Sequence, residues 1–113
     1  MKPKPPKPSI VKPILALLGC LLVPAAVFAA DAGKGKDVFE SNCAVCHNAD
    51  STETKMGPGL KGLFKKAALN NKKKPSDAVI LAIINEGGSA MPGFGDQLTA
   101  AEKSDLIAYL KTL

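Results

Sequence analysis

The sequence predicts a small all-α domain of three or four helices. Apolar residues recur at helical spacing, most clearly Leu106, Tyr109 and Leu110 near the C-terminus. Residues that favour the start of a helix precede two apolar segments, Ser76 before one and Thr99 before the other. No stretch alternates apolar and polar residues over the length of a strand. We therefore expect helices joined by glycine-rich loops, and no sheet.

The first half of the predicted domain contains one full helix and one short helix. The full helix covers residues 32–42 and leads directly into a pair of closely spaced cysteines. Polar residues 48–54 and the glycine-rich run 57–62 are typical of turns. Residues 63–69 are expected to form a short helix before the lysine-rich linker at 70–75.

The second half of the domain contains two further helices. Ser76 is expected to cap a helix that runs to about Glu86, ends at Gly87 and is followed by the loop 88–97. The middle of this helix, residues 78–84, is apolar on every side, which predicts a largely buried helix. The last helix begins at a capping box and presents one apolar face; the box is Thr99 and Glu102, and the face is Leu106, Tyr109, Leu110 and Leu113.

Residues 1–29 have the composition of a secretory signal peptide. Residues 1–13 contain four lysines and no acidic residue, and the apolar run 14–23 follows them. Small residues suit cleavage after Ala29, which would leave residues 30–113 as a single domain. Two other readings stay open: an uncleaved membrane anchor, and lipid attachment at Cys20, which follows Leu-Leu-Gly. All three readings predict an exported domain, and we expect it in the periplasm.

The basic charge of the chain belongs to this leader. Without its four lysines, eleven lysines stand against ten acidic residues, which leaves a side-chain charge of +1. The chain contains no arginine, so a general nucleic-acid function has little support. Residues 30–113 also contain few aromatic side chains for a core, and a domain this small often needs a disulfide framework, a metal or another internal apolar body. Only two cysteines remain in residues 30–113, so at most one short disulfide is possible there and something else must fill the core.

Those two cysteines stand beside the only histidine of the chain. Cys43, Cys46 and His47 form the pattern C-x-x-C-H, which is typical of covalent haem attachment. On one helical turn the two thiols point to the same side, where each can bond one vinyl group of the porphyrin, and the imidazole can then bind the iron. A thioredoxin-like redox pair would need a strand–helix–strand context, and a structural zinc site would need four ligands. Haem c fits the exported helical domain best.

Residues 33–113 resemble a class I monohaem c-type cytochrome. Gly35 and Phe39 match the N-terminal helix of that family, and Leu106 and Tyr109 match its last helix. The resemblance implies a cytochrome c-like fold, with three to four helices wrapped around one covalently bound haem. It also implies that Gly35 permits a close crossing of the first and last helices.

The resemblance also implies how the iron is held. His47 is one axial ligand, and the carbonyl group of Pro58 accepts the second N–H of its ring. Met91, in a loop similar to the family's M-P-x-F sequence, supplies the opposite ligand. Met56 is then an ordinary core or surface residue. A Met/His pair raises the reduction potential and leaves no open position on the iron.

We therefore expect a one-electron carrier and not an enzyme. Its partners would be redox proteins that dock transiently at the exposed haem edge, with no nucleic acid, and the protein would be a monomer. A haem-based ligand sensor and a haem subunit of an oxidoreductase remain as alternatives. A basic segment could be either a solvated face or a steering patch for an acidic partner; it comprises Lys61, Lys65, Lys66, Lys72, Lys73 and Lys74.

Overall fold

The structure is a computed structural model that describes residues 2–9 and 29–113. The predicted leader, residues 1–29, therefore lies largely outside the described residues, as do its apolar run and Cys20. Residues 2–9 are exposed and form neither helix nor strand. Within the described ranges, no helix is long and apolar enough to cross a membrane.

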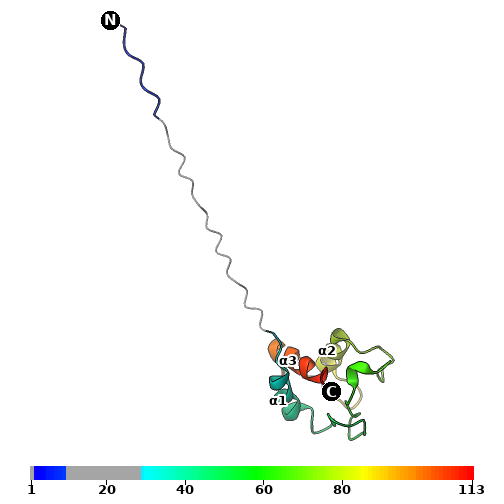
Figure 1. The fold of residues 1–113 in the computed structure, drawn as a ribbon. Coiled ribbons are helices and arrows are strands. Elements are labelled where there is room, and N and C mark those ends of the chain that lie inside the picture. Colours follow the sequence, from blue (N-terminus) through cyan, green and yellow to red (C-terminus); the bar gives the residue numbers. More distant parts are fainter. Residues whose placement is uncertain (1, 10–28) are drawn as a thin grey trace.

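Residues 29–113 form three α-helices and one short 3-10 helix (Figure 1). Their bounds are α1 Ala32–Asn42, η1 Leu63–Lys65, α2 Asp77–Glu86 and α3 Ala100–Leu110. This part of the chain contains no strand, only one isolated antiparallel bridge between Gly88 and Met91. The predicted all-α class is confirmed.

Each α-helix begins at a residue whose side chain accepts backbone N–H groups. The Asp31 carboxylate accepts from Gly33 N and Lys34 N at the start of α1, at 2.8 and 3.2 Å. Ser76 Oγ accepts from the third residue of α2, as expected. The capping box of α3 is also confirmed, because both of its hydrogen bonds are present.

The helices α1 and α3 cross in close contact (Figure 1). A Cβ atom on Gly35 would collide with the carbonyl group of Asp105 and lie 2.8 Å from Tyr109 Cβ, so the crossing requires glycine. The rings of Phe39 and Tyr109 pack with their centroids 5.5 Å apart. Asp31 N also donates to the Asp105 carboxylate at 2.8 Å. The close crossing implied by the family resemblance is therefore present.

The buried core lies between these helices, α2 and η1. Leu106 is its most deeply buried side chain, at 1% exposure. Burial of each such side chain stabilises the fold by roughly 1.5–3 kcal/mol. The core consists of Phe39, Leu63, Ile80, Ile84, Leu98, Leu106, Ile107 and Leu110.

Two predictions about the middle of the chain are wrong. The helix expected at 63–69 ends at Lys65, because the chain turns extended at Lys66. The helix α2 is not largely buried: only Ile80 and Ile84 are, while Ala82 is exposed. A domain this small has too few elements to surround a helix, so α2 buries one face and leaves apolar side chains half-exposed on the others.

Candidate metal centre

The segment Cys43 to His47 forms a single turn directly after α1. Cys43 is the C-cap of the helix, and its N–H donates to Phe39 O at 2.7 Å. His47 N donates in turn to Cys43 O at 2.9 Å, which is a helical hydrogen bond between residues four apart. The packed helix α1 therefore holds both thiols and the imidazole within one turn.

The side chain of His47 is fixed by a backbone carbonyl group. Its Nδ1 lies 2.8 Å from Pro58 O. Because a carbonyl oxygen can only accept, Nδ1 carries the proton and donates it, which leaves Nε2 as the nitrogen with a free lone pair. Such a bond sets the tautomer and the orientation of a metal-binding imidazole and raises its basicity.

Gly57 lies against the face of the same ring. A Cβ atom at this position would collide with His47 Cε1 and lie 2.8 Å from Nδ1. Because Gly57 has no side chain, the His47 ring fits between the Cys43–His47 turn and the loop that carries Gly57 and Pro58. The backbone at this position passes so close to the His47 ring that only glycine fits, which is a common role of glycine.

The loop that carries Gly57 and Pro58 is tied to the Cys43–His47 turn by hydrogen bonds. Gly57 N donates to Cys46 O at 2.8 Å. Lys55 Nζ donates to Ala44 O at 3.0 Å, across an exposed surface. The histidine, the carbonyl that orients it and the glycine beneath it therefore form one unit.

Both cysteines of the turn are free thiols that are half-buried. Burial raises the pKa of the Cys43 thiol to about 11, and the nearby Cys46 adds to this shift. At neutral pH Cys43 is therefore protonated. Neither cysteine binds a partner within residues 29–113, so both are available for covalent attachment of a group.

Met91 lies on a separate loop, residues 87–98, which folds back on the end of α2. Gly88 and Met91 exchange backbone hydrogen bonds of 3.0 and 2.8 Å. Gly87 has φ of +66° and ψ of −153°, and a Cβ atom there would collide with Met91 O. Phe94 N donates to Ile84 O at 2.7 Å. Backbone contacts thus hold the loop, and the Met91 side chain is half-buried.

The donors present fit a haem group with covalent attachment. Two thiols and an imidazole with a fixed tautomer stand in one turn, and a thioether is available on another element. Met56, the other methionine of residues 29–113, is 69% exposed and makes a poor candidate for a buried ligand. In the described part of the chain, no three or more histidine, cysteine, aspartate and glutamate side chains are arranged so that they could hold a metal ion together, as a structural zinc site would require.

Two elements of this site were missed by sequence reasoning. The glycine-rich run 57–62 predicts only a turn at Gly57, although a glycine directly before Pro58 is also a signal for a close approach. Lys103, whose Nζ donates to Gly95 O at 2.7 Å, carries no sequence signal at all, because a single lysine on a helix usually faces solvent.

Comparison with known proteins identifies the family. A family model described as cytochrome c oxidase, cbb3-type, subunit III matches residues 30–110. Cytochrome c6 of Synechocystis sp. is 35% identical over 100 residues, which cover 82% of this chain and 80% of that protein. Cytochrome c6 of Picosynechococcus sp. is 33% identical and covers 90% and 88% of the two chains.

A solved structure gives the same answer for the fold. The crystal structure of cytochrome c6 from the diatom Phaeodactylum tricornutum matches with a TM-score of 0.57 and 28% identity, over 74% of this chain and 93% of that one. The expected cytochrome c fold is confirmed, and so is the expectation of an electron-carrying haem protein that is not an enzyme. The chain belongs to the family of small class I monohaem c-type cytochromes.

Proposed function

We propose that this protein is a periplasmic one-electron carrier with a single haem c. Cys43 and Cys46 would each add a thiol across one vinyl group of the porphyrin, and His47 and Met91 would bind the iron from opposite faces. The observation that carries the proposal is the hydrogen bond from His47 Nδ1 to Pro58 O, 2.8 Å long. It leaves Nε2 unprotonated and aimed by the fold, as an iron ligand requires.

When bound, haem supplies the one-electron couple, and the protein sets its conditions. His47 would hold one axial position with a fixed tautomer. Met91 would fill the other position with a weak donor, which raises the potential and closes the iron to oxygen and peroxide. The α1–α3 crossing would keep the Cys43–His47 turn in place during each electron transfer.

The alternatives need an open iron. A ligand sensor must release Met91, and a peroxidase-like enzyme also needs an acid–base side chain over the iron. The Met91 loop contains no histidine or arginine, and its aspartate, Asp96, is exposed. These features favour the carrier.

The proposed function is tested by a potentiometric titration of the haem-loaded protein. A carrier with His/Met ligation shows one reversible step that follows a one-electron Nernst curve, with low-spin spectra in both states. A high-spin spectrum in either state would contradict the proposed ligand pair, and an irreversible step would contradict the carrier function.

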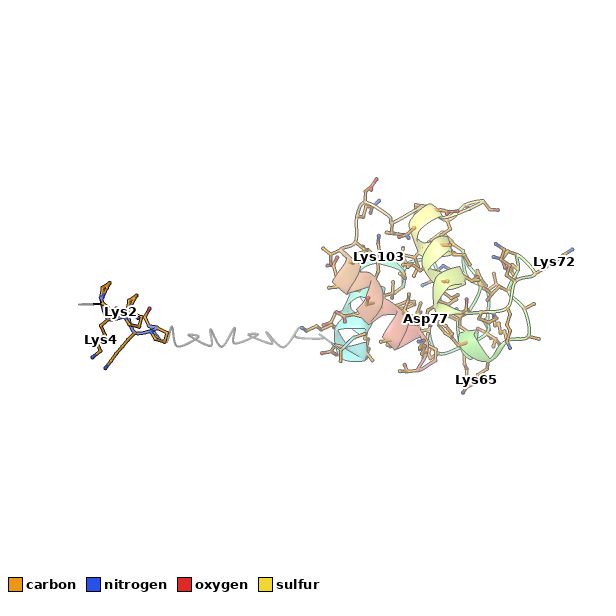
Figure 2. All side chains as sticks on the ribbon, turned by 90° about the horizontal axis from the view of Figure 1, so that it is seen from above. Lys2, Lys4, Lys65, Lys72, Asp77 and Lys103 are labelled. Atoms are coloured by element: carbon orange, nitrogen blue, oxygen red, sulfur yellow. The ribbon has the colours of Figure 1, made fainter. Side chains whose placement is uncertain are left out.

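A partner would dock over the segments that hold His47. Val45, which stands between Cys43 and Cys46, is 65% exposed, and Met56, which directly precedes Gly57, is 69% exposed. Figure 2 shows Lys65 on η1 and Lys72 on the loop that follows it, both directed outward on the side of the body away from α1. If the basic segment steers an acidic partner, reduction rates fall with salt and fall again when Lys72, Lys73 and Lys74 are neutralised. Salt-independent rates would leave the segment as a solvated face.

One comparison favours a second candidate, a haem subunit of a membrane oxidoreductase. The family model that matches residues 30–110 is described as an oxidase subunit. Purification of the exported protein separates the two. A carrier is recovered alone with one haem, whether its leader is cleaved, retained or lipidated at Cys20, whereas a subunit is recovered in a complex with other chains.

A further inference from the structure

The Met91 loop meets the rest of the fold on two sides. On one side, backbone N–H groups of Phe94 and Gly95 donate to Ile84 O and Asn85 O of α2, at 2.7 and 3.2 Å. On the other side, within residues 29–113, one side-chain hydrogen bond connects the loop to α3. It runs from Lys103 Nζ to Gly95 O and is 2.7 Å long.

The peptide groups of Gly95 are therefore held from both helices. The Gly95 N–H donates to α2 and the Gly95 carbonyl accepts from α3. Met91 is four residues away in the same loop, and the intervening chain is short and includes Pro92 and Gly93. For Met91 to move away from its seat by loop opening, the Gly95 contacts must loosen or break.

Lys103 stands at a place where the helix itself does not favour a cation. It is the fourth residue of α3, near the positive end of the helix dipole. Its side chain is half-buried and lines the hollow between α2 and α3, beside Leu81 and Ile107. Figure 2 shows Lys103 at this end of α3. The helix dipole does not favour a lysine at this position, whereas the hydrogen bond to Gly95 O does.

We propose that Lys103 is a positioning residue that holds the ligand loop closed and keeps Met91 on the iron. Its ammonium group acts through the Gly95 carbonyl and does not touch the haem ligand itself. The inference rests on the proposed function in one respect, because it takes Met91 as the sixth ligand. It adds that a lysine of the last helix sets how often this ligand leaves.

The test is the rate of imidazole binding to the oxidised, haem-loaded protein. At saturating imidazole the rate reaches a plateau that equals the rate at which Met91 leaves the iron. Lys103→Met keeps the apolar stem and removes the donor, and it should raise the plateau about tenfold, the usual worth of a part-buried hydrogen bond from a charged donor. Lys103→Arg keeps a donor and should return the rate to within about twofold of the unaltered protein.

Lys111→Met is the matched control. Lys111 is the C-cap of α3, and its Nζ donates to the Asp77 carboxylate at 2.8 Å, on the first turn of α2 and away from the ligand loop. This variant loses an exposed lysine contact from α3 that reaches α2 and not the ligand loop, and its plateau should stay within about twofold of the unaltered rate. Equal acceleration by both variants, or no acceleration by Lys103→Met, overturns the inference.

A second readout does not depend on the iron ligand. Amide hydrogen exchange at Phe94 and Gly95 should speed about tenfold in Lys103→Met and remain unchanged in Lys111→Met. If the unaltered protein binds imidazole at a rate that rises without a plateau, Met91 is not the leaving ligand and the proposed function fails. The exchange result then still decides whether Lys103 holds the loop; unchanged exchange overturns that claim.

Discussion

The loop around His47 and the loop around Met91 are held in different ways. On the histidine side, the ligand's own ring is fixed by Pro58 O and by the close approach of Gly57. On the methionine side, the contacts are made by the backbone around Met91, through Gly88 and through the carbonyl groups of α2. One side positions a side chain directly, and the other positions only the chain that carries it.

This difference matches the two kinds of ligand. An imidazole has a second nitrogen, so a carbonyl group can aim it before any metal is bound. A thioether has no donor and accepts only weakly, so the fold can aim it only through the backbone and by packing. We therefore expect His47 to stay bound to the iron and Met91 to be the ligand that leaves first.

The largest effect is expected from Met91→Ala. Loss of the thioether opens the sixth position, so the reduced protein should bind carbon monoxide. The reduction potential should fall by an amount on the order of 0.1 V or more, since axial ligands set haem potentials over a wide range. Voltammetry measures the potential. Met56→Ala is the control and should change neither property, because Met56 is largely exposed. A reversed pattern would assign the ligand to Met56.

Gly87→Ala should distort the backbone that positions Met91 while leaving the Met91 side chain itself in place. Its φ of +66° with ψ of −153° is a backbone conformation that is open almost only to glycine, and the new Cβ atom would collide with Met91 O. We expect a loss of about 3 kcal/mol in the free energy of unfolding from strain and overpacking together. Guanidinium unfolding measures the loss, and carbon monoxide should now bind. A variant that is destabilised but still closed to carbon monoxide would show that this turn does not seat Met91.

Gly57→Ala should affect the histidine side instead. The added methyl group collides with the His47 ring, and the free energy of unfolding should fall by about 2 kcal/mol, a usual cost of overpacking. The haem spectrum should shift as the imidazole tilts, while the sixth position stays closed to carbon monoxide.

Gly33→Ala serves as the control for both glycine variants. Gly33 stands inside α1, and its Cβ atom would lie 3.1 Å from Asp31 Oδ1, the oxygen that caps the helix, so this carboxylate need shift by only a few tenths of an ångström. Alanine there should leave stability unchanged or raise it by about 0.5 kcal/mol. If Gly33→Ala costs as much as Gly57→Ala, the contact with the imidazole is not the cause.

The smallest effect is expected from Lys55→Met. Lys55 Nζ donates to Ala44 O at 3.0 Å, the same chemistry as Lys103 on the methionine side, but in an exposed position. Water competes for an exposed bond, so its loss should cost about 0.5 kcal/mol in unfolding free energy. Imidazole binding should not accelerate. An effect as large as that of Lys103→Met would show that the two sides are not held differently.

The sequence predicted the parts of this protein that depend on local chemistry. The bounds of α1 and α2 followed from capping and periodicity, and the single turn shared by Cys43, Cys46 and His47 followed from their spacing. The parts that failed depend on distant neighbours. The exposure of α2 reflects how few elements surround it, and neither the Gly57 approach nor the Lys103 bond can be read from a spacing, because each joins segments that only the fold brings together.

Carbon monoxide binding to the reduced, unaltered protein, followed by its absorption spectrum, tests directly whether both axial positions of the iron are filled. If His47 and Met91 hold the iron from both faces, the spectrum stays unchanged in carbon monoxide and the protein is a carrier. If carbon monoxide binds readily at low concentration, the sixth position is open or labile. That result would contradict the account and would favour a ligand-binding or catalytic haem protein.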